Sequence, residues 1–291
     1  MYKRQAHPYA TLGGNSSDPV LALARSVFLS SGFIVLTFDF RGAGRSSGTT
    51  SWTADAEVQD YVSMVGFGIG YLKWLKAGLV GFGGGENQGL VPGEGRQYPG
   101  GICGGYGLTS IHPFEIVLGG YSYGSLIVQK IPPPKELLYR FLTHAITAGS
   151  PEALLDEQAQ MLAAGYIRRF SEKPQPQPQQ PSNEPSVPGV GFSYLLISPL
   201  LWPLSAALTL QMRPFDPDKA RGGHKTLAIF GGQDGFTSAQ RLEKWARRCG
   251  SKEYSRSFTY QLIEEAGHIW REQGVAGELQ QAIQNWLRPP R

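Results

Sequence analysis

The chain has 291 residues, which is enough for one large α/β domain or two small ones. It is 41% hydrophobic and 17% charged, so it can bury a sizeable core. Its net charge of +4 comes from 27 basic and 23 acidic residues scattered along the chain. A nucleic-acid-binding protein would gather its basic residues into a patch or stripe, so the charge pattern argues against that class.

Cysteine content and hydropathy exclude further classes. Cys103 and Cys249 are too few for a disulfide framework or a four-ligand zinc site. The opening residues, MYKRQAHPYA, lack the apolar core of a signal peptide. No run approaches the ~18 apolar residues that a membrane span requires. The sequence predicts a soluble, cytoplasmic protein without a membrane span or a nucleic-acid partner.

The first predicted helix begins at Asp18 and Pro19, because an acid at the N-cap followed by proline is a favourable helix start. It ends at Gly32, and the apolar run FIVLTFDF follows at 33–40. A continuous apolar run of this length fits a parallel strand that is buried on both faces. Apolar residues at helical spacing then predict a helix over 52–76, although three glycines weaken its middle.

Strands and helices continue to alternate along the rest of the chain. Predicted strands lie at 114–118, 193–198, 226–232 and 258–263. Predicted helices follow the first of these strands, cover 151–170 and 238–248, and close the chain with Leu279, Ile283 and Trp286 on one apolar face. Such alternation is typical of a parallel sheet with helices on both faces, so the sequence predicts a doubly wound, mostly parallel α/β fold.

We expect a single domain over 1–291 that carries two insertions. The first, at 81–107, is glycine-rich and lacks the G-K-[ST] of a phosphate-binding loop. The second, at 132–190, combines the helix at 151–170 with a proline- and glutamine-rich segment at 173–190 that cannot pack a core. The helix of the second insertion could fold over a functional site as a lid.

Three polar residues follow three of the predicted strands. Ser122 lies in the G-x-S-x-G pattern GYSYG after the strand at 114–118, Asp234 follows the strand at 226–232, and His268 follows the last strand. Functional groups of open parallel sheets gather beyond the carboxyl ends of the strands. A serine, an aspartate and a histidine at that edge are the components of a catalytic triad, with Ser122 on a nucleophile elbow.

Several motifs together resemble the α/β-hydrolases, most closely the small bacterial and fungal serine hydrolases of that superfamily. They are HPY at 7–9, DFRGAGRS at 39–46, GYSYG at 120–124, GGQD at 231–234 and AGH at 266–268. The resemblance covers nearly the whole chain apart from the two insertions. The resemblance implies the α/β-hydrolase fold and a serine hydrolase, and it does not fix the substrate.

Each residue of the pattern has a chemical role. Serine is a poor nucleophile on its own, so His268 would take the proton of Ser122, and Asp234 would orient and stabilise the imidazole. The oxyanion needs preorganised donors. One would be the backbone N–H of Tyr123, and the resemblance implies that the second is the N–H of Tyr9 in the HPY loop.

The substrate would be a small acyl compound, and the chemistry needs no metal or organic cofactor. Trp202, Phe236 and Trp270 flank the expected site, where they would either line an acyl pocket or fill the core. Asp216 and Asp218 are rival candidates for the triad acid. Taken alone, Ser122 could instead be a turn serine.

The start of the chain departs from the family pattern. An apolar strand normally precedes the HP loop, whereas here MYKRQA is short and polar, so we expect the leading strands of the sheet to be absent and the HPY loop to be poorly supported. The sequence therefore predicts a serine hydrolase of the carboxylesterase or thioesterase type that cleaves an ester or thioester, less readily an amide. The alternatives are a catalytically impaired interaction protein and an acyltransferase that uses the same triad.

Overall fold

The computed structural model describes residues 2–6, 13–80, 114–143, 147–170, 190–209, 223–251 and 257–288. Six strands form its sheet: β1 (Tyr2–Ala6), β2 (Ile34–Thr37), β3 (Glu115–Tyr121), β4 (Gly191–Ile197), β5 (Lys225–Gly231) and β6 (Phe258–Ile263). They lie in the order β2-β1-β3-β4-β5-β6, and every neighbouring pair is parallel. All carboxyl ends of the strands therefore meet at one edge of the sheet.

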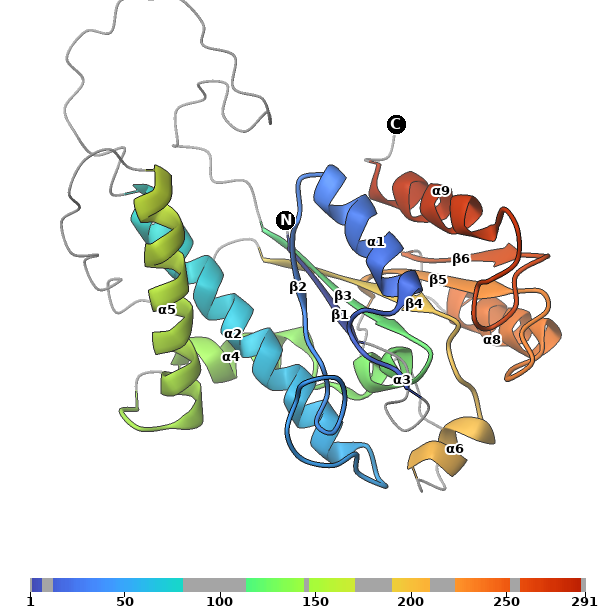
Figure 1. Ribbon diagram of the computed structural model, residues 1–291, viewed down its shortest axis with the longest axis horizontal. Helices are drawn as coiled ribbons and strands as arrows, with labels where there is room; N and C mark the ends of the chain where they lie inside the picture. Colours follow the sequence, from blue (N-terminus) through green and yellow to red (C-terminus); the bar gives the residue numbers. More distant parts are fainter. Residues whose placement is uncertain are drawn as a thin grey trace, which may run out of the picture.

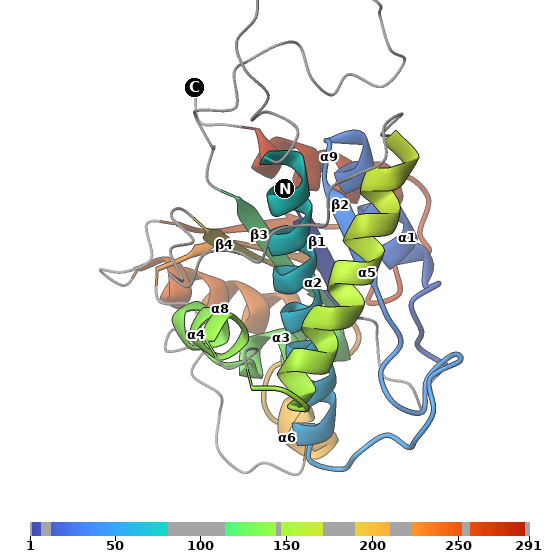
Figure 2. The same cartoon turned by 90° about the vertical axis from the view of Figure 1, so that its left-hand side faces the viewer.

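Helices cover both faces of this sheet (Figures 1 and 2). They are α1 (Pro19–Ser30), α2 (Asp55–Val80), α3 (Tyr123–Lys130), α4 (Pro134–Thr143), α5 (Pro151–Phe170), α6 (Leu204–Thr209), α8 (Ala239–Ser251) and α9 (Val275–Leu287). The pair α1 and α9 packs on one face, and α2, α3 and α8 pack on the other. The predicted doubly wound, parallel α/β fold is confirmed.

The strand before the HPY motif is present, contrary to our expectation. Residues Tyr2–Ala6 form β1 between β2 and β3, with Tyr2 in register with Ile34 on one side and Ile116 on the other. Both edges of its backbone are paired, so the polar composition of MYKRQA does not prevent a strand. No strand precedes β1 among the described residues, and the HPY motif itself falls in 7–12, outside them.

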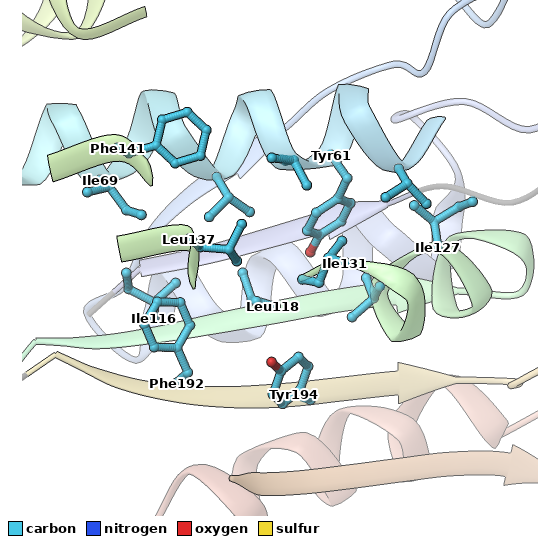
Figure 3. Packing of buried hydrophobic residues seen from close by; sticks show 14 of the residues in the cluster. Tyr61, Ile69, Ile116, Leu118, Ile127, Ile131, Leu137, Phe141, Phe192 and Tyr194 are labelled. Atoms are coloured by element: carbon cyan, nitrogen blue, oxygen red, sulfur yellow. The ribbon is translucent and has the colours of Figure 1, made fainter. Parts of the chain in front are cut away.

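The larger core lies between α2, α3, α4 and the sheet (Figure 3). The side chains labelled there that build it are Tyr61, Ile69, Ile116, Leu118, Ile127, Ile131, Leu137, Phe141, Phe192 and Tyr194. The Tyr61 hydroxyl satisfies its hydrogen-bonding need by donating to the carbonyl of Gly119 in β3, 3.2 Å away. The second core fills the space between the sheet, α1 and α9.

The helix α2 is continuous through the glycines that the sequence suggested would weaken it. A Cβ on Gly66 would overlap the ring of Phe141 in α4, and one on Gly70 would lie 3.1 Å from the Cβ of Ala159 in α5. The glycines thus let α4 and α5 approach α2 closely. Burial of this face outweighs the low helix propensity of glycine.

Two helices were not predicted. The three prolines at 132–134 end α3, but the last of them is also the first residue of α4, where proline is well tolerated. The short α6 lies between β4 and β5, where the sequence predicted no helix.

The helix predicted at 151–170 is confirmed as α5. It packs along α2 rather than over the carboxyl ends of the strands (Figure 1). The insertion at 81–107 and most of the proline- and glutamine-rich segment lie outside the described residues. None of the helices described is both long and apolar enough to cross a membrane.

Candidate active site

Ser122 lies at a sharp turn between β3 and α3. Its backbone has φ 53° and ψ −118°, a conformation that non-glycine residues rarely adopt. The Ser122 N–H donates to the carbonyl of Ile197 in β4, 2.9 Å away, and the Ser122 carbonyl accepts from the N–H of Ser125 at 2.9 Å. Hydrogen bonds from β4 and α3 therefore hold the strained residue in place.

Gly120 makes this turn possible. A Cβ at that position would overlap the backbone carbonyl of Gly124, one turn further along the chain. The first glycine of the GYSYG motif is thus required because β3 and α3 approach each other closely. This sharp turn from strand to helix, hereafter the elbow, is the geometry that the G-x-S-x-G motif predicts.

The structure brings Ser122, His268 and Asp234 together although they come from three separate loops. The Oγ of Ser122 lies 2.7 Å from Nε2 of His268. The Nδ1 of His268 lies 2.7 Å from Oδ2 of Asp234. All three residues are buried.

The carboxylate decides which ring nitrogen of His268 carries the proton. An ionised Asp234 can only accept a hydrogen bond, so Nδ1 is the donor. In a neutral imidazole the other nitrogen, Nε2, is then an acceptor, and it faces the hydroxyl of Ser122. The arrangement can therefore take a proton from Ser122.

Backbone donors orient the carboxylate of Asp234. Its Oδ1 accepts from the N–H groups of Phe236 at 2.8 Å and Thr237 at 3.0 Å, which leaves Oδ2 for His268. The glycine pair before Asp234 allows the loop of the histidine to come this close. A Cβ on Gly231 would overlap the carbonyl of Ala266, and a Cβ on Gly232 would overlap that of Glu264.

Two side chains hold the turn that carries His268. The hydroxyl of Tyr121 donates to the carbonyl of His268 at 2.8 Å, and the indole N–H of Trp270 donates to Oγ of Ser198 at 2.9 Å. Neither contact was predicted. The available signals were position at the carboxyl end of β4 for Ser198 and position directly before Ser122 for Tyr121.

Two groups around this turn have shifted pKa values. Burial raises the pKa of Tyr121, so its phenol stays protonated and remains a donor at neutral pH. The carboxylate of Glu272 accepts hydrogen bonds from backbone N–H groups, first from that of Gly267, and these lower its pKa. Glu272 is therefore an anion next to the residue that precedes His268.

The three aromatic candidates for substrate contact differ in exposure. Trp202 is 53% and Phe236 is 47% exposed, whereas Trp270 is 7% exposed and packs in the core between the sheet, α1 and α9. The ring centroid of Phe236 lies 4.4 Å from that of His268. Phe236 and Trp202 thus have exposed surface for a ligand, while the contacts of Trp270 favour a structural role.

The two candidate oxyanion donors have different standing. Tyr123 is the first residue of α3, so its backbone N–H belongs to the positive end of that helix, next to Ser122. Tyr9 lies outside the described residues, as do Asp216 and Asp218, the rival candidates for the acid.

Among the described parts of the chain, no group of three or more potential ligands that could hold a metal ion occurs.

The loop of the DFRGAGRS motif is fixed by ionic contacts. The guanidinium of Arg41 forms two hydrogen bonds with the carboxylate of Asp60, at 2.6 and 3.0 Å. Asp39 accepts from the N–H of Ser16 at 2.7 Å. These two residues of the motif therefore hold the loop and not the reacting groups.

Comparison with solved structures identifies the fold. An esterase from Pyrococcus furiosus is 14% identical, with a TM-score of 0.52 over 98% of this chain and 80% of that one. A protein of unknown function from Agrobacterium tumefaciens, a candidate α/β-hydrolase, is 16% identical, with a TM-score of 0.50 over 98% of this chain and 83% of that one. Neither models of protein families nor curated protein sequences match this chain.

The parallel sheet and the elbow at its carboxyl edge define an α/β protein of the doubly wound class. More narrowly, the chain has the α/β-hydrolase fold, as its motifs implied.

Proposed function

We propose that this chain is a serine hydrolase that transfers an acyl group from a small ester or thioester to water, through an acyl-enzyme on Ser122. The observation that carries the proposal is the continuous chain of hydrogen bonds from Ser122 through His268 to Asp234, with 2.7 Å at each step. The fold supports it, because the elbow presents Ser122 at the edge of the sheet where this fold class has its sites.

The chemistry follows from the geometry. His268 Nε2 removes the proton as Oγ of Ser122 attacks the carbonyl carbon, and Asp234 stabilises the imidazolium that forms. The same imidazolium then protonates the departing alkoxide or thiolate. A water molecule deprotonated by His268 attacks the acyl-enzyme in the second half and releases the acid, which restores Ser122.

The tetrahedral intermediates carry a negative charge that needs donors. The N–H of Tyr123 at the start of α3 is the proposed first donor, and the N–H of Tyr9 is the proposed second. Loss of one such donor costs ~10²–10³ in rate. Because alcohols and thiols leave more easily than amines, an ester or thioester is the proposed bond ahead of an amide.

A fluorophosphonate probe tests the proposal, because it reacts covalently with an activated serine and needs no knowledge of the substrate. We expect a single adduct by intact mass, absent in Ser122→Ala and strongly slowed in His268→Ala. Ser193→Ala is the matched control, since Ser193 is a buried serine of β4 that donates to Glu115 instead of a histidine. Hydrolysis of a panel of aryl esters and acyl thioesters would then define the acyl group.

Other outcomes separate the alternatives. A folded protein that forms no adduct would contradict the proposal and favour a catalytically impaired interaction protein. Adduct formation combined with ester products in the presence of a competing alcohol, in place of the free acid, would identify an acyltransferase.

A further inference from the structure

The turn that carries His268 is held by groups outside the proposed triad. Tyr121, which donates to the carbonyl of His268, is the residue directly before Ser122. The strand that presents the serine therefore also holds the backbone of the histidine. A hydrogen bond of 2.8 Å joins these two positions although 147 residues separate them in sequence.

Trp270 holds the other end of the same turn. Its φ is 60°, and that of its partner Ser198 is 45°, so both residues lie in the left-handed region that non-glycine residues seldom occupy. Ser122 has φ 53° as well, and Ala54 is the one further non-glycine residue with positive φ among the described parts of the chain. Backbone strain of this kind persists where neighbouring contacts fix the conformation, and it concentrates at functional sites.

We propose that Tyr121 and Trp270 are positioning residues, whose hydrogen bonds to the His268 carbonyl and to Ser198 keep the imidazole between Ser122 and Asp234. The inference rests on the proposed function, because it concerns the same histidine. It assigns to Tyr121 the role of aligning His268 with Ser122. Both side chains act through the turn of His268: the Tyr121 hydroxyl holds its carbonyl, with the Tyr121 ring centroid 6.0 Å from that of the imidazole, and Trp270 holds Ser198.

Tyr121→Phe tests the first contact, because it removes the hydroxyl and keeps the ring. Tyr61→Phe is a matched control: it also removes a buried hydroxyl that donates to a backbone carbonyl, that of Gly119 in the same strand. We expect Tyr121→Phe to slow fluorophosphonate labelling by ~10- to 100-fold, since small misplacements of catalytic groups have effects of that size. Tyr61→Phe should label at the wild-type rate.

Trp270→Phe tests the second contact, because it removes the N–H that Ser198 accepts. Trp286→Phe is its control, since the Trp286 indole N–H is buried in the same core without a partner among the described residues. We expect slower labelling for Trp270→Phe and for Ser198→Ala. The double variant Trp270→Phe/Ser198→Ala should label no more slowly than the slower of the two single variants, because both changes break the same hydrogen bond.

A spectroscopic measurement separates positioning from loss of stability. The proton on Nδ1 of His268 lies in the hydrogen bond to Asp234, so we expect it to give a proton NMR signal far downfield of the amides. We expect this signal to shift or broaden in Tyr121→Phe and Trp270→Phe, and to stay unchanged in both controls. Equal labelling rates and an unchanged signal in the two test variants would overturn the inference.

The two proposals fail in different ways. Absence of labelling in the wild-type protein would contradict the proposed function, and the downfield signal would still report whether Tyr121 and Trp270 position His268. Normal wild-type labelling with no effect of either variant would contradict only the positioning roles. If Tyr121→Phe or Trp270→Phe does not fold, the comparison of the other test variant with its matched control decides whether the inference holds.

Discussion

At the scale of single residues, the candidate site depends on atoms that are each fixed by a second partner. Asp234 shows this most clearly, because one carboxylate oxygen accepts two backbone N–H groups while the other faces His268. Ser122 is fixed in the same way by the backbone of Ile197 and by the start of α3. The side chains that would react therefore have little freedom to leave their positions.

Asp234→Asn separates the charge of this residue from its structural contacts. The amide keeps an oxygen for the N–H groups of Phe236 and Thr237, so the loop should stay folded. Its NH₂ group would donate to Nδ1 of His268 and move the ring proton to Nε2, which faces Ser122. We expect fluorophosphonate labelling to slow by ~10⁴-fold, measured as a second-order rate constant.

Asp60→Asn is the control for this variant. It removes the charge of the partner of Arg41 and keeps a carbonyl oxygen that can accept from Arg41 in the DFRGAGRS loop, away from the three residues of the candidate triad. This variant should label at the wild-type rate. A rate for Asp234→Asn close to that of the control would contradict the proposed role of the acid.

The sequence was sufficient to name the residues that meet at the site, because each follows a strand and parallel strands end at one edge. It was not sufficient to predict the hydrogen bonds that hold these residues in place. The contact of Tyr121 with the carbonyl of His268 depends on how the loop after β6 folds back over β3, and no local pattern encodes that path. The same holds for Trp270, whose indole could equally have pointed to a ligand.

At the scale of elements, the close approach of neighbouring helices explains why the low helix propensity of glycine was a poor guide to α2. The helix predicted over 52–76 is confirmed as α2, which begins and ends a few residues later, at Asp55 and Val80. The glycines do not interrupt its middle, because Gly66 faces Phe141 and Gly70 faces Ala159 across helix–helix contacts. The strand at 33–40 was overestimated, since β2 covers only Ile34–Thr37. The aromatic residues beyond β2 leave the sheet, and Phe40 enters the core through edge contacts with Phe38 and Tyr123.

Two glycine-to-alanine changes distinguish the packing role of a helical glycine from its low helix propensity. Gly165 lies on an exposed part of α5 with open space around a Cβ, so Gly165→Ala should raise the free energy of unfolding by about 0.5–1 kcal/mol. Gly66→Ala places its methyl group into the ring of Phe141 and should lower the free energy of unfolding by about 1–3 kcal/mol. Urea unfolding curves of both variants measure the difference, and effects of the same sign would contradict it.

At the scale of the whole molecule, burial is concentrated in the middle of the sheet. Six of the seven residues in each of β3, β4 and β5 are buried, whereas β6 alternates between partly buried and exposed positions. Cores lie on both faces of the central strands. The alternation of strands and helices made this architecture predictable, but the position of β1 inside the sheet was missed because its sequence is polar.

Hydrogen exchange should follow this distribution of burial. Amides in β3, β4 and β5 open only when most of the structure unfolds, so they should exchange most slowly. Amides of β2 and β6, at the two edges of the sheet, should exchange faster. Hydrogen–deuterium exchange followed by mass spectrometry of peptides tests this order, and faster exchange in β4 than in β6 would contradict it.

The attachment of α5 outside α2 has a mechanical consequence. Among the described residues, the extensive contacts of α5 are with α2, and α2 packs in turn on α3, whose first residue follows Ser122. A force on α5 is therefore transmitted to the elbow through α2, a helix of 26 residues. We expect that a tether or an extension attached to α5 disturbs the geometry around Ser122 less than one attached to α3.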